Sequence, residues 1–425
     1  MRRERVFTMD TSRIAFGCGA RHEVGEALRA LGGMRVLLLT DPLLRDGGVV
    51  ADVLASLGAA GLDATVFADV EIEPSDASLA RAIAFAQDGA FDAYVAVGGG
   101  SVIDTAKAAN LYATYPADLM AYVNPPIGRG EGVPGPLRPL VAVPTTAGTG
   151  SETTGVVIFD VRSMRAKTGI AHRALRPALG IVDPDVARTM PAMVAACSGL
   201  DVLSHAVESL TALPFDRRDA PATPGARPAY QGSNPVSDVW AARAIELSRD
   251  HLVRAVSDPD DDEAREAMML AATYAGIGFG NAGVHLPHGM SYPVSGMVRD
   301  YRPEGYPQTK PLVPHGMAVA LNAPAVFRFT GAAAPERHLL AASLLGAEVA
   351  GADPADAGEL LAGAFVELMR ALGMPNGLAA LGYAAADAPA LARGTLPQER
   401  VTKLAPRPAH EADLVALFES SMRIW

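Results

Sequence analysis

The sequence has little cysteine, no long apolar run and no excess of positive charge. Cys18 and Cys197 are its only cysteines, too few for a disulfide framework. No stretch approaches the roughly 18 consecutive apolar residues of a membrane-spanning helix. The 36 Lys and Arg residues are outnumbered by 47 Asp and Glu, giving a net charge of −11. This balance disfavours nucleic acid and anionic membrane surfaces as partners.

The first ten residues carry charge but lack the apolar core of a secretory signal. Their early arginines resemble a transit peptide, yet Glu4 and Asp10 interrupt the segment, and the strand-like segment 11–16 follows at once. We therefore expect a cytoplasmic protein with no membrane or nucleic-acid partner.

The sequence does contain enough apolar residues for two hydrophobic cores. Its 425 residues are 49% hydrophobic and 20% charged, as in a soluble globular protein. A chain of this length exceeds one ordinary core, so two domains are expected.

Apolar runs and helical periods alternate through the first half of the chain. Four runs are typical of buried strands: 34–41, 63–70, 92–100 and 139–146. Such alternation predicts a parallel sheet with helices on both faces. Three later runs, 155–160, 165–170 and 179–183, resemble an antiparallel or edge addition.

Helical periodicity dominates from about residue 190, most clearly at 263–283, 336–350 and 357–373. We predict a dinucleotide-binding α/β domain with a parallel, Rossmann-like sheet over residues 1–190. An all-helical domain that binds metal and substrate is predicted over residues 191–425.

A glycine-rich loop, Gly98, Gly99, Gly100 and Ser101, follows the third apolar run and precedes a helical period. Glycine allows backbone N–H groups to approach a pyrophosphate, and the start of a helix favours negative charge. Asp104 in the first helical turn suits that dipole but would repel phosphate unless it bonds a backbone N–H. The alternative is a turn that needs glycine only for packing.

A second loop, 144–152, leaves the next apolar run and offers the hydroxyls of Thr145, Thr146, Thr149 and Ser151. Hydroxyls and exposed amides can bind phosphate or ribose. Because the carboxyl ends of parallel strands share one edge of the sheet, two such loops together indicate a dinucleotide site.

Asp41 ends the first strong strand pattern, where a carboxylate can bind ribose hydroxyls and repel a 2′-phosphate. This placement predicts NAD over NADP, but an ordinary Asp41-Pro42 turn explains the residue equally well. The common G-x-G-x-x-G pattern does not follow that strand.

Four residues of the second half have the chemistry of a divalent transition-metal site. Asp201 and His205 are four apart in a helical pattern, so their side chains leave one face. His288 and His315 each stand in the sequence Pro-His-Gly-Met, interpreted as a rigid, open turn. Three imidazoles and a carboxylate leave one coordination position for substrate. Glu208 could orient a ligand, and His285 is either a similar helper or a core residue.

Several motifs together resemble the iron-containing (group III) alcohol dehydrogenase family. They are GGGSVIDTAK, PTTAGTGSE, the DVLSHAVES helix and the two Pro-His-Gly turns. Segments 230–241, 276–296, 311–317 and 394–406 resemble its hydroxyacid–oxoacid transhydrogenase branch. The likeness covers almost the whole chain.

The resemblance implies roles for individual residues. It places the metal ligands on Asp201, His205, His288 and His315. It places the dinucleotide-binding residues on Asp41, Gly98, Gly99, Gly100, Ser101, Asp104, Thr145, Thr146, Thr149 and Ser151, and it puts Lys167 close to the cofactor. The sequence departs from the family at Tyr292, where many members carry a histidine credited with relaying the alcohol proton. A catalytic proton relay would then use Tyr292, His285 or water.

The resemblance also implies a reaction: 4-hydroxybutyrate and 2-oxoglutarate give succinate semialdehyde and (R)-2-hydroxyglutarate. NAD would stay bound, Fe²⁺ or Zn²⁺ would polarise the reacting oxygen, and the protein would be a homodimer. The carboxylates of these hydroxyacid and oxoacid substrates call for a cation. The candidates are Arg299, Arg302, Lys310, Arg400, Lys403 and Arg407.

Three alternatives stay open at this point. One is a conventional alcohol or semialdehyde dehydrogenase whose NAD exchanges freely. A dehydroquinate-synthase-like lyase would need a basic phosphate-substrate pocket, which the helical half lacks. A metal-stabilised nucleotide sensor would not need the open coordination position.

Overall fold

The computed structural model describes residues 3–164, 166–306 and 310–425, and these residues form two compact units. One unit comprises Asp10–Met190. The other comprises Pro191–Trp425 together with residues 3–9, which the sequence analysis assigned to the α/β domain.

The first unit is built on a six-stranded sheet in the order β1-β8-β5-β4-β2-β3, and every pairing in it is parallel. The strands are β1 (Arg13–Phe16), β2 (Arg35–Leu39), β3 (Asp63–Phe67), β4 (Ala93–Gly98), β5 (Leu140–Pro144) and β8 (Leu179–Val182). The parallel α/β architecture predicted from the alternating pattern is therefore confirmed.

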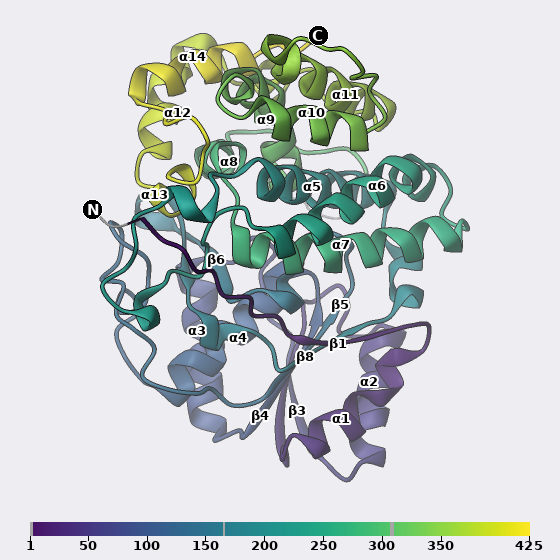
Figure 1. Cartoon of the computed structure of the whole chain (residues 1–425). Helices are drawn as coiled ribbons and strands as arrows, with labels where there is room; N and C mark the ends of the chain where they lie inside the picture. The colour runs from purple at the N-terminus through teal and green to yellow at the C-terminus, as the bar shows by residue number, and fades with distance from the viewer. Residues whose placement is uncertain (1–2, 165, 307–309) are drawn as a thin grey trace. The chain divides into compact units, whose positions relative to one another are not determined.

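Helices cover both faces of this sheet because the strands carry apolar side chains on both faces (Figure 1). The helices of the unit are α1 (Val24–Ala30), α2 (Gly48–Ala59), α3 (Asp76–Gly89) and α4 (Gly100–Thr114). In β2, Val36 and Leu38 pack in a core with α1 and α2, whereas Leu37 and Leu39 pack in a second core with α3 and α4. The sheet is thus buried between two pairs of helices.

The three later apolar runs divide between two structures. β6 (Val156–Val161) and β7 (Ala166–Ala171) form an antiparallel hairpin, as the sequence suggested; residue 165 lies outside the described part. The prediction for 179–183 was wrong, because β8 lies inside the parallel sheet between β5 and β1. Four consecutive buried residues fit either position, so the pattern did not separate them.

The second unit consists of helices, which confirms the predicted change of class. Its helices are α5 (Ala192–Thr211), α6 (Pro235–Ser257), α7 (Asp262–Ala282), α8 (Leu286–Gly296), α9 (His315–Gly331), α10 (Pro335–Leu344), α11 (Ala357–Ala371), α12 (Ala388–Thr395), α13 (Glu399–Thr402) and α14 (Glu411–Ser421). The helical pattern predicted over 336–350 ends early at Leu344, because Gly346 adopts a φ of 92° and turns the chain.

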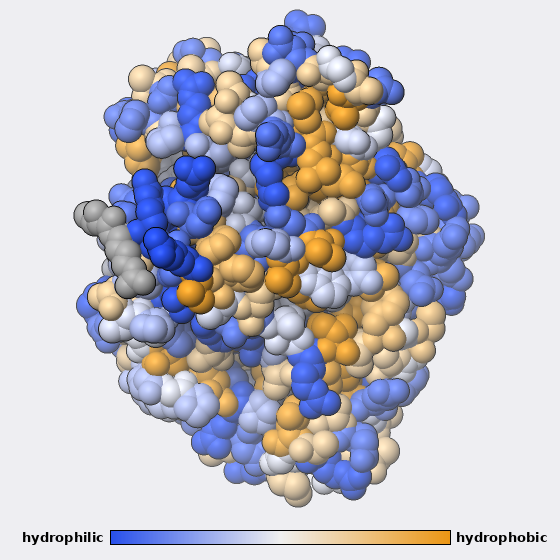
Figure 2. All heavy atoms as spheres, in the orientation of Figure 1, coloured by the Kyte–Doolittle hydropathy of each residue, from blue (hydrophilic) through white to orange (hydrophobic). Residues whose placement is uncertain are grey.

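Among the described residues, no helix is both long and apolar enough to cross a lipid bilayer. On the face seen in Figure 2, hydrophobic and hydrophilic residues are intermixed. The most exposed large hydrophobic side chain is that of Val239 on α6, which is 66% exposed.

Candidate metal centre and cofactor loops

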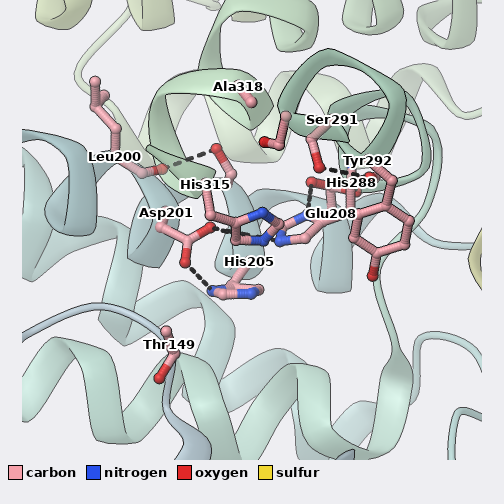
Figure 3. A network of polar contacts seen from close by, with 12 residues as sticks. Thr149, Leu200, Asp201, His205, Glu208, His288, Ser291, Tyr292, His315 and Ala318 are labelled. Carbon is pink, nitrogen blue, oxygen red and sulfur yellow. Dashed lines mark hydrogen bonds and ion pairs between the residues drawn. The ribbon is translucent and has the colours of Figure 1, made fainter. Parts of the chain in front are cut away.

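The helical unit brings three of the four predicted metal ligands into one cluster. Asp201, His288 and His315 each offer a ligand atom, and these atoms all lie within 4.8 Å of one another. Oδ1 of Asp201 is 3.5 Å from Nε2 of His288 and 3.9 Å from Nε2 of His315. The fourth residue, His205, places Nδ1 3.9 Å from Oδ2 of Asp201 (Figure 3).

Three helices supply these side chains. Asp201 and His205 leave one face of α5, while His288 lies in the first turn of α8 and His315 begins α9. The Pro-His-Gly segments are therefore helix starts rather than isolated turns. A Cβ on Gly316 would lie 2.0 Å from the carbonyl oxygen of Cys197 and 2.8 Å from Cβ of Asp201. Glycine after the histidine thus allows α9 to approach α5 beside the cluster.

The donor atoms of the cluster fit a bound cation. Oδ1 of Asp201, Nδ1 of His205 and Nε2 of His288 are buried and have no hydrogen-bond partner among the described residues. A buried polar atom without a partner costs about 1–3 kcal/mol, and three in one cluster would be expensive unless a ligand satisfies them. Nitrogen and carboxylate oxygen are suitable ligands for a divalent transition metal.

Glu208 orients one of the imidazoles, as its position one helical turn after His205 suggested. Its Oε1 lies 2.5 Å from Nδ1 of His288, and its Oε2 accepts the backbone N–H of His285 at 2.7 Å. Because a carboxylate can only accept, Nδ1 of His288 carries the proton and Nε2 faces Asp201. Burial alone would lower the pKa of His288, but Glu208 and Asp201 together outweigh it and raise that pKa to about 10.

Two other predicted ligands, His205 and Asp201, are held in forms that suit a metal. Burial lowers the pKa of His205 to about 3, so its ring is neutral at ordinary pH. Burial would raise the pKa of Asp201, but the neighbouring histidines outweigh it and hold that pKa well below its usual value. The ring of His205 stacks on Phe279 with centroids 3.9 Å apart, which fixes its plane.

The two candidates for a proton relay differ in their surroundings. The His285 ring is fully buried, and its Nε2 lies 3.0 Å from the hydroxyl of Thr211. Burial lowers the pKa of His285 to about 4. Tyr292 is also buried, but its ring lies beside His315 with centroids 6.1 Å apart, and its hydroxyl accepts a hydrogen bond from Arg400 at 3.0 Å. Of the two, Tyr292 has the described contact with a ligand ring.

In the α/β unit, the two predicted cofactor loops pack against each other. A Cβ on Gly99 would lie 3.2 Å from Oγ1 of Thr146, and one on Gly100 would lie 2.5 Å from Cγ2 of Thr149. Gly99 caps α4 without any side-chain hydrogen bond to the first N–H groups of that helix. An uncapped helix start beside hydroxyl groups is a suitable place for a phosphate.

Asp104 joins the two loops by hydrogen bonds. Its Oδ1 accepts from the hydroxyl of Ser151 at 3.0 Å and from Nζ of Lys107 at 3.2 Å, and its Oδ2 accepts the N–H of Ile158 at 2.9 Å. These bonds remove the repulsion that the carboxylate would otherwise exert near a phosphate. Lys107 was not predicted as part of this site, although Asp and Lys at i and i+3 of a predicted helix are a recognisable pair.

The remaining predicted cofactor residues have structural partners. Oδ1 of Asp41 accepts the N–H groups of Leu43 and Leu44, as in an Asp-Pro turn, and burial raises its pKa. The N–H of Thr145 bonds the carbonyl of Gly98.

Two further predicted cofactor residues, Ser101 and Lys167, both contact Glu73. The hydroxyl of Ser101 accepts the N–H of Glu73 at 3.1 Å. Lys167 is buried and pairs with Glu73 and with Asp160, which is 3.3 Å away.

The six candidate cations for a substrate carboxylate are not equivalent. Arg299 pairs with Asp387 at 2.6 Å, and the exposed Lys403 pairs with Glu399. Arg407 is exposed and lies over the ring of Phe329, and Arg302 and Lys310 are also exposed. Arg400 is half-buried and, among the described residues, has no carboxylate within ion-pair distance.

Comparisons with known proteins agree with this architecture. A family model described as iron-containing alcohol dehydrogenase matches residues 11–184, and one for the C-terminal part of the Fe-containing alcohol dehydrogenase family matches residues 229–422. A relative from Mus musculus named mitochondrial hydroxyacid–oxoacid transhydrogenase is 55% identical over 422 residues, which are 99% of this chain and 91% of the relative.

Two solved structures resemble the fold. One is 1,3-propanediol oxidoreductase, with a TM-score of 0.85, 31% identity and coverage of 98% of this chain and 100% of the other. The second is sulfoacetaldehyde reductase from Bifidobacterium kashiwanohense in complex with NAD⁺, with a TM-score of 0.79, 25% identity and 99% of each chain covered.

The chain belongs to the iron-containing alcohol dehydrogenase family, and it is an oxidoreductase. The resemblance to the hydroxyacid–oxoacid transhydrogenase branch is likewise confirmed. Membership implies a nicotinamide cofactor and a divalent metal. The expected cytoplasmic location is wrong, since the relatives from mouse, cattle and human are all named as mitochondrial proteins. The charge pattern of the first ten residues was a weak basis for that expectation.

Proposed function

We propose that this chain is a hydroxyacid–oxoacid transhydrogenase. Bound NAD would carry a hydride from the alcohol carbon of 4-hydroxybutyrate to C2 of 2-oxoglutarate. Loss of a proton from the hydroxyl of the first acid and uptake of a proton by the keto oxygen of the second would give succinate semialdehyde and (R)-2-hydroxyglutarate. The observation that carries this proposal is the similarity to the mouse transhydrogenase along 99% of the chain.

The proposed metal ligands are Asp201, His205, His288 and His315. A bound Fe²⁺ or Zn²⁺ would polarise the hydroxyl or carbonyl oxygen of the substrate. Burial keeps His205 neutral in this site. The Nδ1–H of His288 donates to Glu208, which leaves Nε2 as the atom that would bind the metal. Tyr292, beside His315, is the proposed proton-handling group, with its hydroxyl held by Arg400.

The proposed NAD site lies in the α/β unit. Its phosphates would meet the uncapped start of α4 at Gly98, Gly99, Gly100 and Ser101. The hydroxyls of Thr146 and Thr149 in the second loop lie beside that helix start. Thr145 and Ser151 of the same loop are further proposed contacts. Asp104 holds the loops together through Ser151. Asp41 and Lys167 remain proposed cofactor contacts, and the homodimer remains a proposal from the family resemblance.

The test is a transfer assay on desalted protein without added NAD. The protein is incubated with 2-oxoglutarate and with 4-hydroxybutyrate deuterated at the alcohol carbon, and 2-hydroxyglutarate is quantified by mass spectrometry. We expect many turnovers per protein, with the deuterium retained in the product. Product that appears only after NAD is added, with free NADH formed from the alcohol alone, would instead identify a conventional dehydrogenase.

A further inference from the structure

Arg400 in α13 is a cation with no anionic partner among the described residues. Its Nη2 donates to the hydroxyl of Tyr292 at 3.0 Å, and its guanidinium lies over the ring of Tyr230, 5.2 Å from the centroid. Its Nη1 is buried and has no hydrogen-bond partner in the described part of the chain. A guanidinium removed from water normally finds a carboxylate or phosphate, because an unpaired buried charge is costly.

One set of contacts joins this arginine to the metal ligand His315. Tyr292 accepts the bond from Arg400, and its ring lies nearly parallel to that of His315, with an interplanar angle of 21°. In Figure 3 the Tyr292 ring extends past His288 with its hydroxyl at the free end. The guanidinium of Arg400 is therefore held at the hydroxyl end of the Tyr292 ring, next to the cluster.

A second set of contacts joins the arginine to His205. The ring of Tyr230, below the guanidinium, packs edge-on against Phe279 with centroids 6.4 Å apart, and Phe279 stacks on His205. Together, the two sets of contacts connect Arg400 to two of the proposed metal ligands, His315 through Tyr292 and His205 through Tyr230 and Phe279. Within this set, Arg400 is a cation with no carboxylate partner in the described part of the chain.

We propose that Arg400 binds the remote carboxylate of both substrates, with Tyr292 as the positioning residue; this inference rests on the proposed function. In 4-hydroxybutyrate the carboxylate carbon is three C–C bonds, each about 1.5 Å, from the carbon that loses hydride. In 2-oxoglutarate the distal carboxylate is also three C–C bonds from the carbon that accepts it. One arginine at a fixed distance can therefore serve both half-reactions, and a guanidinium can bond both carboxylate oxygens.

The experiment compares KM and kcat of the holoenzyme and of Arg400→Gln with matched substrates. 4-Hydroxybutyramide is the neutral counterpart of the hydroxyacid, and 2-oxobutyrate lacks the remote carboxylate of 2-oxoglutarate. We expect Arg400→Gln to raise KM for both natural substrates by about 10- to 100-fold, the effect of losing a charged hydrogen-bond partner. KM for these two compounds, which lack an ionised remote carboxylate, should not rise, and Arg400→Lys should recover part of the loss.

Lys403→Gln is the matched control, because Lys403 is an exposed cation of the same segment that pairs with Glu399. Its KM values should equal those of the parent protein. An equal rise in KM for compounds with and without the remote carboxylate in Arg400→Gln, or no rise for either, would overturn the inference. If that variant does not fold, Tyr292→Phe provides the second test. Tyr292→Phe also removes the proposed proton-handling hydroxyl, so kcat should fall for every compound. KM should rise for the carboxylate substrates and not for the amide, because Tyr292 positions Arg400.

The failure of this inference is distinguishable from that of the proposed function. If the parent protein transfers deuterium between the two acids and Arg400→Gln keeps its KM values, only the inference fails. If the parent protein makes no labelled 2-hydroxyglutarate, the proposed function fails.

Discussion

At the residue scale, local spacing predicted that two of the proposed metal ligands and Glu208 share one helix face. Asp201, His205 and Glu208 recur at helical spacing, so one face of α5 had to carry all three. The partners that come from other helices could be named by type but not placed. Nothing in the spacing of Tyr230 and Arg400 indicates that their side chains meet, because that contact depends on how α13 packs in the helical unit.

Glu208→Gln should weaken metal binding while leaving the fold intact. A neutral amide oxygen accepts the Nδ1–H of His288 more weakly than a carboxylate does. The imidazole therefore loses both orientation and basicity. Loss of such a partner typically lowers metal affinity about 10- to 100-fold. Competition with a chelator, followed by measurement of bound metal, tests this.

The matched control is Ser204→Ala, which removes a buried hydroxyl of the same helix whose hydrogen bond, among the described residues, goes to the carbonyl of Leu200. It should retain the metal. Equal metal affinity in Glu208→Gln and the parent protein would show that the 2.5 Å contact does not support the site.

At the scale of elements, apolar periodicity predicted where strands and helices occur better than it predicted which elements pair or pack with one another. The parallel sheet followed from alternation of strand and helix patterns, but the place of β8 did not, since a four-residue buried run has no marker of its partners. The two cofactor loops were expected to share an edge because the strands are parallel. Their direct packing, through Gly99 and Gly100, required the structure.

Gly100→Ala should destabilise the α/β unit by about 1–3 kcal/mol, the usual cost of overpacking. The added methyl would lie 2.5 Å from Cγ2 of Thr149, so one of the two loops must move. In a Thr149→Ala background the nearest remaining atom is Cβ at 3.0 Å, so the cost should shrink. Thermal unfolding measures the cost in stability, and titration with NAD measures the affinity for the cofactor.

Gly48→Ala is the control for this prediction, since a Cβ there meets nothing within 4 Å at the start of α2. It should not lower stability or NAD affinity. Additive costs for Gly100→Ala and Thr149→Ala would contradict the proposed contact between the loops.

At the scale of the whole molecule, the chain passes between the two units twice, after Met9 and after Met190. Residues 3–9 are held in the helical unit by polar contacts. Arg227 bonds the carboxylate of Glu4 at 3.0 Å, and Gln231 exchanges hydrogen bonds with the backbone of Thr8. The sequence did not predict this assignment, because a short polar segment has no periodicity that marks its partner.

The Glu4–Arg227 pair should make a pH-dependent contribution to stability. The hydrogen bond from Arg227 lowers the pKa of Glu4 from 4.5 to about 2. The stabilisation is therefore fully present above pH 4.5 and lost as the pH falls towards 2. Glu4→Gln should cost up to about 1 kcal/mol at pH 7, a value suited to a pair near the surface.

Thermal unfolding at pH 7, 4 and 3 tests this, and the deficit of Glu4→Gln should narrow as the pH falls. Glu26→Gln, at an exposed ion pair of α1, is the comparison and should show no deficit of this kind. A deficit that is the same at all three pH values would argue that the lost contact is not ionic.

The return of residues 3–9 to the helical unit has a consequence for synthesis on the ribosome. Their partners Arg227 and Gln231 are made 223 residues later, long after the sheet has all its strands. The α/β unit can therefore fold while the segment before it still waits for its partners, since domains form as units during translation. The contacts of residues 3–9 therefore form at a late stage of folding. If this segment docks slowly, the helical unit stays incomplete even when the sheet is native.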